Sequence, residues 1–176
     1  GERNIPIARH IYIEQDDFSL NPPPKWQRLT VGGEVRLRYS YVIKCEEVVT
    51  DEAGNVIELK CSIDHETLGK KPEGRKVKGV IHWVSASQGV PATVRMYEQL
   101  FSAEDPSSVA DVHQALNPNS LIELDAVVEP SLANSDAGTR FQFEREGYFI
   151  ADSEDHSSDK PVFNQIVSLR DSYKPA

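Results

Sequence analysis

The sequence predicts a mainly β protein built from two antiparallel β-barrels and one short helix. Apolar and polar residues alternate along several runs, a period that is typical of half-buried strands. Prolines and glycines separate these runs at short intervals, as in barrels and sandwiches. Because 176 residues suffice for two small domains, we expect a first barrel at 1–88 and a second at 89–176. Strand exchange between the first barrel and the C-terminus stays open.

The first strand is expected over residues 33–44, GEVRLRYSYVIK. Its apolar or aromatic odd positions are Val35, Leu37, Tyr39, Tyr41 and Ile43. Its polar even positions are Arg36, Arg38, Ser40 and Lys44, and only Val42 interrupts the alternation. The pattern predicts one continuous strand with the odd positions on a core and the even positions in solvent.

A hairpin is expected next, because turn residues at 51–55 separate two β-prone segments. Further strands are expected over residues 79–84, 92–100, 120–129, 139–150 and 161–170. The one helix is expected over 109–116, VADVHQAL, where apolar residues share a face. Ser107 or Ser108 would cap its start, and NPNS at 117–120 would end it.

The charge balance excludes a protein that coats nucleic acid regardless of sequence. The chain has 28 Asp and Glu against 19 Lys and Arg, a net charge of -9, and indiscriminate binding draws on summed positive charge. A local basic groove stays compatible with this balance. No apolar run approaches the roughly 20 residues of a membrane span, and the N-terminus lacks the apolar core of a signal peptide. We expect a cytoplasmic monomer that does not bind membranes.

Motifs for catalysis or metal binding are missing from the sequence. It contains no P-loop, GxGxxG or GxSxG motif. Its five histidines and two cysteines form no CxxC, HExxH or Cys/His cluster with the spacing of a zinc site. Cys45 and Cys61 lie in apolar or alternating runs and are expected to be reduced thiols, with a disulfide between them as the minor alternative. We therefore expect no catalytic residue and no metal in this chain.

Basic residues offer the strongest functional signal. In KKPEGRKVK, residues 70–78, five of nine are basic, and Lys70, Lys71, Arg75 and Lys76 are candidates for contacts to a phosphate backbone. A solvated surface loop is the alternative. Arg36 and Arg38 are either a wet strand face or a pair of guanidinium groups that grip base edges.

Several longer motifs, in this order, carry a family resemblance: RLRYSYVIK, GRKVKGVIHWVS, EPSL, FQFEREGYF and KPVFNQIVSLRDSY. Together they resemble the C-terminal anticodon-binding region of bacterial glutaminyl-tRNA synthetases, over essentially the whole chain. The resemblance implies two ribosomal-protein-like β-barrels that grip the anticodon loop of glutamine tRNA. It also implies a separate N-terminal catalytic domain, which uses ATP and Mg²⁺ and lies outside this chain. The chain alone is then a non-catalytic, cofactor-free part of a ligase of protein biosynthesis.

The resemblance also implies roles for individual residues. Arg28 would read the third anticodon base, and Arg38 the first, with Arg36 beside it. Gln142 and Arg145 would read the central uridine. The remaining candidates are Arg170 in support and Lys25 at a phosphate.

One departure and two alternatives qualify this interpretation. The family has a basic residue where Gln27 stands here, which puts the local phosphate contacts in doubt. The related anticodon-binding region of a glutamyl-tRNA synthetase is one alternative. The other is a stand-alone, non-catalytic β-barrel binding protein that keeps the fold without RNA.

Overall fold

A computed structural model describes residues 3–169 of the chain, which fall into two compact units. One unit is the continuous segment Arg9–Ser85. The other combines residues 3–8 with residues 86–169. A division at residue 88 assigns 3–8 to the first unit, whereas in the structure this segment belongs with the second.

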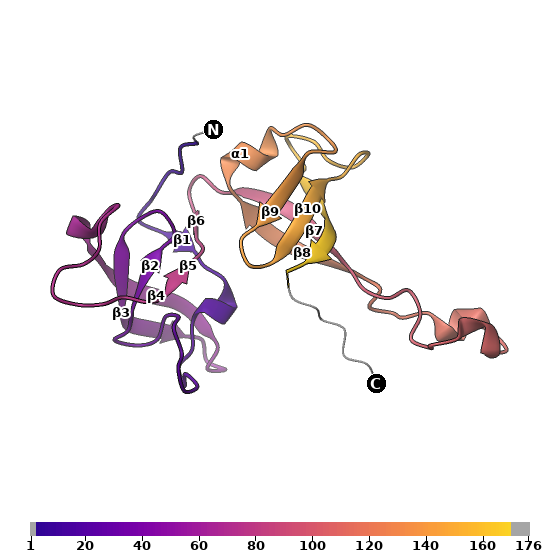
Figure 1. The fold of residues 1–176 in the computed structure, drawn as a ribbon, viewed down its shortest axis with the longest axis horizontal. Helices are drawn as coiled ribbons and strands as arrows, with labels where there is room; N and C mark the ends of the chain where they lie inside the picture. The colour runs from indigo at the N-terminus through magenta and orange to yellow at the C-terminus, as the bar shows by residue number, and fades with distance from the viewer. Residues whose placement is uncertain (1–2, 170–176) are drawn as a thin grey trace. The chain divides into compact units, whose positions relative to one another are not determined.

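The unit of residues 9–85 is built on a four-stranded sheet with the strand order β4, β3, β2, β5 (Figure 1). Its strands are β2 (Glu34–Leu37), β3 (Val42–Thr50), β4 (Val56–Asp64) and β5 (Val80–Ile81). β2 and β4 lie antiparallel to β3, whereas β2 and β5 run parallel. β1 (Ile11–Tyr12) pairs separately with β6 (Val84–Ser85). The core includes Leu29, Val35, Leu37, Val42, Cys45, Ile81 and Trp83.

The expected single strand over residues 33–44 is in fact two strands joined by a turn. β2 ends at Leu37, and the Ser40 N–H donates to the Leu37 carbonyl at 2.8 Å. Val35 and Leu37 are buried as predicted, but Tyr39 is 72% exposed. On the return strand the adjacent Val42 and Ile43 are both buried. Alternation alone does not distinguish one strand from two short ones, and the apolar residue that interrupted it marked the break.

The hairpin predicted around residues 51–55 is confirmed. β3 and β4 pair antiparallel on either side of it, and the Asp51 carboxylate accepts the N–H groups of Ala53 and Asn55 at 3.0 and 2.8 Å. Cys45 and Cys61 face each other across these strands as free thiols. The bonds that the Asp51 carboxylate accepts are the usual way in which an aspartate side chain fixes a turn.

The second unit has a five-stranded sheet in the order β8, β7, β11, β10, β9. The strands are β7 (Val90–Tyr97), β8 (Leu121–Val128), β9 (Arg140–Phe143), β10 (Gly147–Ala151) and β11 (Val162–Ser168). β7 and β11 run parallel, and the other neighbours are antiparallel. Four phenylalanines pack at its centre, with Phe143 stacked on Phe149 at 4.3 Å and both Phe141 and Phe143 edge-on to Phe163.

The mainly β prediction is confirmed and most strand pairs are antiparallel, but the sheets of residues 3–169 are not closed into barrels. The edge strands are β4 and β5 in one sheet and β8 and β9 in the other, and neither pair joins to close its sheet. Each sheet also contains one parallel pair. Alternation identifies which residues of a strand face the core; it does not specify which strand lies alongside.

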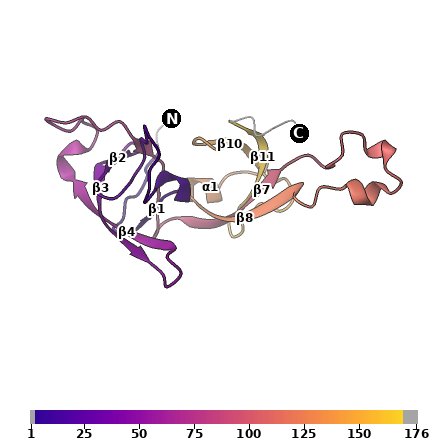
Figure 2. The ribbon, with the colours of Figure 1, turned by 90° about the horizontal axis from the view of Figure 1, so that it is seen from below.

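The helix predicted at 109–116 is wrong. That region contains only the 3-10 turn η4 (Val112–Ala115), which follows a second 3-10 turn, η3 (Pro106–Ser108), in the excursion between β7 and β8 seen in Figures 1 and 2. Its apolar face finds no core, because Val109, Val112 and Leu116 are exposed. Within the described residues the α-helix is α1 (Pro130–Ala133), and no helix there is long and apolar enough to cross a membrane.

The carboxylate of Asp152 holds the turn between β10 and β11. One oxygen accepts the backbone N–H groups of Glu154 and Asp155, both at 2.8 Å. The other accepts from Asn164 Nδ2 at 2.5 Å and lies 3.4 Å from Arg95 Nη1. These contacts, led by the Asp155 N–H, lower the pKa of Asp152 to about 2.

Asp152→Asn is expected to destabilise the second unit near neutral pH and to flatten its response to acid. The folded pKa of Asp152 lies below the unfolded value of about 3.9. Its stabilisation is therefore present above about pH 4 and is lost as the pH falls towards 2. Thermal unfolding of both proteins, followed by circular dichroism across this range, measures the difference. Identical acid sensitivity of the two proteins would contradict the assignment.

Candidate nucleic-acid interface

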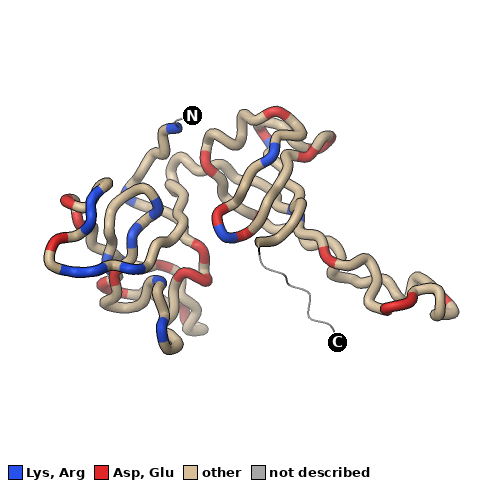
Figure 3. The backbone as a smooth tube through the Cα atoms, in the orientation of Figure 1, with Lys and Arg blue, Asp and Glu red and all other residues tan. Residues whose placement is uncertain are grey.

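The basic residues of the chain are concentrated in one of its two units. Residues 9–85 contain twelve Lys and Arg and twelve Asp and Glu, so this unit is formally neutral. The rest of the sequence contains seven Lys and Arg and sixteen Asp and Glu, which account for the whole net charge of -9. Figure 3 shows this difference along the backbone, with acidic and no basic positions in the excursion at 98–120. Residues 9–85 therefore repel a polyanion less than the acidic remainder of the chain does.

Arg38 lies in the turn between β2 and β3, and its backbone is fixed from two directions. Its N–H donates to the Ile81 carbonyl at 2.9 Å, and its carbonyl accepts from the buried indole of Trp83 at 3.0 Å. The guanidinium carbon lies 4.9 Å from the centroid of the Tyr39 ring. Arg38 therefore begins from a rigid backbone, which lowers the entropic cost of any contact it makes.

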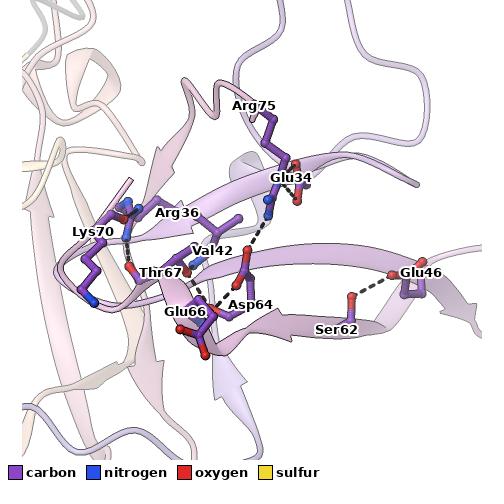
Figure 4. A network of polar contacts seen from close by, with 10 residues as sticks. All are labelled: Glu34, Arg36, Val42, Glu46, Ser62, Asp64, Glu66, Thr67, Lys70 and Arg75. Carbon is purple, nitrogen blue, oxygen red and sulfur yellow. Dashed lines mark hydrogen bonds and ion pairs between the residues drawn. The ribbon is translucent and has the colours of Figure 1, made fainter. Parts of the chain in front are cut away.

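Arg36 contacts protein carbonyls, whereas the sequence predicts an RNA-facing side chain beside Arg38. Its Nη1 donates to the Ser40 carbonyl at 2.7 Å. Figure 4 shows the other two bonds, from Nη1 to the Thr67 carbonyl at 2.8 Å and from Nη2 to the Lys70 carbonyl. These bonds join the turn after β2 to the segment after β4. Arg36 thus supports the framework around Arg38, and the single continuous strand that would have aligned the two does not exist.

Thr67 anchors the segment after β4 to the sheet. It closes the 3-10 turn η2 (His65–Thr67) and is 1% exposed. Its hydroxyl donates to the Asp64 carbonyl at 2.6 Å and accepts the Val42 N–H at 2.8 Å. Residues 70–78, which we call the basic loop, therefore leave the sheet from a fixed point. No sequence pattern marks Thr67 for this role.

Within the basic loop, Arg75 is committed to two carboxylates. Its Nε lies 2.9 Å from Glu34, and its Nη2 lies 2.6 Å from Asp64 (Figure 4). Hydrogen bonds to Glu34 and Asp64 raise the pKa of Arg75. The charge that the sequence offered to phosphate is thus neutralised within the protein. Arg75 instead fixes the loop beside β2.

Lys70, Lys71 and Lys76 extend into solvent from the basic loop. All three are exposed, and none makes an ion pair within residues 3–169. The loop that carries them is fixed by Arg75 at one point and by Arg36 at another. An anchored loop of unpaired ammonium groups can follow a phosphate backbone with little ordering cost.

Arg28 is held by protein contacts but keeps part of its surface exposed. Its Nη1 donates to the Asp16 carbonyl at 2.7 Å, and its Nε lies 3.4 Å from the carboxylate of Asp17. The guanidinium carbon also lies 5.7 Å from the centroid of the Trp26 ring. The side chain of Asp17 is 0% exposed and that of Arg28 27%, so Arg28 neutralises a buried charge. Lys25, nearby in sequence, is exposed.

Gly79 permits the segment before Arg28 to pack against the start of β5. A Cβ at position 79 would lie 2.0 Å from the Gln27 carbonyl oxygen and 2.9 Å from Val35 Cγ1. The Gly79 carbonyl also accepts the Arg36 N–H at 2.9 Å. Only a residue without a side chain fits here. The sequence offers no signal for this contact beyond the glycine itself.

In the second unit, Gln142 projects from β9 as the alternation predicts. Its neighbours Phe141 and Phe143 pack on the core, whereas Gln142 is exposed and stands opposite Tyr148 of β10. Arg145 lies in the β9–β10 turn with φ 69°. An exposed amide can both donate to and accept from a base edge. Arg170 lies outside the described residues.

In comparison with known proteins, both halves of the chain match family models that have the same description. Family models described as tRNA synthetases class I (E and Q), anti-codon binding domain, match residues 1–64 and 80–152. Glutamine-tRNA ligases of Chromobacterium violaceum and Neisseria meningitidis are 60% and 57% identical over 99% of the chain. That of Ectopseudomonas mendocina is 52% identical over 98%. The chain spans 32% of the length of each of these relatives.

The two matched segments together cover most of the chain. They include strands β2 to β4 with the turn at Arg38, and the β9–β10 turn. The first match contains Arg28, Arg36 and Arg38, and the second contains Gln142 and Arg145. The relatives agree with both matches over nearly the whole sequence. The chain therefore belongs to the anticodon-binding domains of the class I tRNA synthetases (E and Q).

Proposed function

We propose that the chain recognises the anticodon loop of glutamine tRNA as part of a glutamine-tRNA ligase. The observation that carries this proposal is the 60% and 57% identity, over 99% of the chain, to relatives named glutamine-tRNA ligase. The family description covers enzymes for both Glu and Gln, and these relatives favour Gln. The whole protein would attach glutamine to its tRNA in the cytoplasm, and it would act as a monomer.

ATP and Mg²⁺ would serve the catalytic part of the whole protein. Within residues 3–169 no group of three or more His, Cys, Asp or Glu side chains is arranged to hold a metal ion. This chain would instead contribute binding energy and selectivity. Arg38 would grip the first anticodon base, since a guanidinium can hold a base edge with two parallel hydrogen bonds.

The protein contacts of the other candidates divide them into base-reading, phosphate-contacting and supporting residues. Gln142 would read the central base with its exposed amide, and the exposed part of Arg28 would contact the third base. The lysines of the basic loop would contact phosphates and supply affinity that depends on salt and not on sequence. Arg36 and Arg75 would act indirectly, by holding the turn and the loop.

The proposal is tested by titrating the chain with the glutamine-tRNA anticodon stem-loop at two salt concentrations. A loop with a changed central base and a glutamate-tRNA loop serve as comparisons. Preference for the glutamine loop at both salt concentrations would support it. Preference for the glutamate loop would transfer the chain to the Glu branch of the family. A folded chain without affinity for any loop would be a β binding protein that does not recognise RNA.

Arg38→Ala is expected to weaken binding of the glutamine loop by about 1–3 kcal/mol and to relax selectivity at the first anticodon base. The loss follows from removing a bidentate contact to one base. Arg9→Ala is the matched control, because Arg9 is an exposed arginine of the same unit. Equal losses with every first base would reassign Arg38 to a phosphate contact.

A further inference from the structure

Tyr39 has an unfavourable backbone conformation, and its exposed side chain gains no stabilisation from burial. Its φ is 59°, in the left-handed region that a bulky residue rarely adopts. It occupies the third position of the turn closed by the bond from the Ser40 N–H to the Leu37 carbonyl, where glycine or asparagine is usual for this backbone. Its side chain is 72% exposed, so burial does not compensate for the strain.

The surrounding structure fixes the backbone on both sides of Tyr39. The Ser40 carbonyl accepts from Arg36, and the Leu37 N–H donates to the Tyr41 carbonyl at 2.9 Å. Ser40 itself is 5% exposed, so the residue after Tyr39 is locked into the unit. Strained conformations that are fixed on all sides in this way are characteristic of functional positions.

The immediate neighbour of the ring is a cation that also suits nucleic acid. The Arg38 guanidinium carbon lies 4.9 Å from the ring centroid, within the range of a cation–π contact. Unpaired bases stack on both aromatic rings and guanidinium planes, and stacking is worth more when the platform is already fixed. An exposed ring beside an arginine is poorly matched to an apolar protein surface, which would have to bury the charge.

We propose that Tyr39 is a stacking platform for an unpaired base of the bound RNA, next to the base that Arg38 contacts. This proposal rests on the proposed function and adds to it a residue that reads no sequence. The ring would hold one base in place by its π-face, so that the Arg38 guanidinium meets an ordered target. Loss of the ring therefore lowers affinity for every loop sequence and leaves the preference at the first base in place.

The test compares Tyr39→Asn and Tyr39→Phe for binding of the glutamine-tRNA stem-loop. Asparagine tolerates positive φ, so Tyr39→Asn removes the ring and is expected to fold at least as stably as the wild type. It is expected to bind about 5-fold to 150-fold more weakly, the loss of one stacked base. Tyr39→Phe keeps the ring and the affinity. Tyr12→Phe and Tyr12→Asn, at a tyrosine that is 54% exposed in the same unit, are the matched controls.

A second readout separates stacking from mere support of Arg38. A stem-loop with the fluorescent base 2-aminopurine at each anticodon position in turn is quenched where that base stacks. Quenching that Tyr39→Phe retains and Tyr39→Asn loses supports the platform. Wild-type affinity in Tyr39→Asn, or quenching that survives in it, overturns the platform while the proposed function stands. A wild-type chain that binds no loop overturns both.

Discussion

Gly79→Ala is expected to destabilise the unit of residues 9–85 by about 3 kcal/mol or more, because the added methyl group has no space. Its Cβ would lie 2.0 Å from the Gln27 carbonyl oxygen and 3.0 Å from the Gln27 carbonyl carbon. Both are backbone atoms, so the chain before Arg28 must move. The displacement is also expected to weaken RNA binding, since Arg28 would leave its site on Asp17.

Tryptophan fluorescence during urea unfolding measures this effect in the right unit, because both tryptophans, Trp26 and Trp83, lie between residues 9 and 85. Gly54→Ala is the matched control. Gly54 has φ 86° at the tip of the β3–β4 hairpin, and a Cβ there meets nothing within 4 Å. Only the cost of a left-handed alanine, about 1–2 kcal/mol, is expected. A Gly79→Ala protein as stable as Gly54→Ala would show that the 26–28 segment packs elsewhere.

Arg36→Ala is expected to destabilise the same unit by about 3 kcal/mol and to loosen the basic loop. The substitution removes three charge-assisted bonds to backbone carbonyls, each worth about 1.5–3 kcal/mol in a protein. Part of the lost stability is recovered because the freed carbonyls of Thr67 and Lys70 can accept hydrogen bonds from water. Arg36→Lys is expected to recover only a fraction, because an ammonium group cannot copy the planar fork.

Hydrogen exchange over residues 65–78, together with urea unfolding, tests the role of Arg36. Arg9→Ala, which removes an equal charge from an exposed site, should leave both unchanged. RNA affinity should fall in Arg36→Ala without any change in base preference, unlike in Arg38→Ala. Loss of base preference with an unchanged exchange rate would restore the direct RNA contact that the sequence predicts.

The sequence predicts those parts of the fold that depend on neighbours along the chain. The β3–β4 hairpin follows from turn residues at 51–55, and β7, β8 and β11 of the second unit lie in runs expected as strands, whereas the single strand expected over 139–150 is the β9–β10 hairpin. Gln142 on the outside of β9, opposite the phenylalanines on its core face, is a direct result of that period.

The sequence fails where the outcome depends on residues far apart. The parallel partner of β2 comes from β5, beyond an entire hairpin, and nothing within β2 specifies it. The apolar face at 109–116 favours a helix, but the excursion provides no surface to bury it, so only a short 3-10 turn forms there.

The same limit applies to the candidate interface. The residue types are visible in the sequence, but the partners are not, so paired and unpaired cations look alike. Arg75 has two carboxylates supplied by Glu34 and Asp64, whereas Lys76 beside it has none within residues 3–169. The alternation wrongly predicts that Tyr39 faces the core for a related reason. The turn that exposes Tyr39 can be identified only once the strand is known to end at Leu37.

The two units are nested in sequence, which sets an order for folding during synthesis. β1 and β6 pair near the two ends of the 9–85 unit, so that unit is able to form once residue 85 has left the ribosome. Residues 3–8 emerge before residues 9–85 but cannot reach Glu129, whose carboxylate accepts from Arg3 at 2.7 Å, until the second unit has been synthesised. Residues 3–8 are therefore among the last of the described residues to reach their final contacts, and in a nascent chain ending near residue 100 the 9–85 unit is folded while residues 3–8 still lack the Glu129 contact.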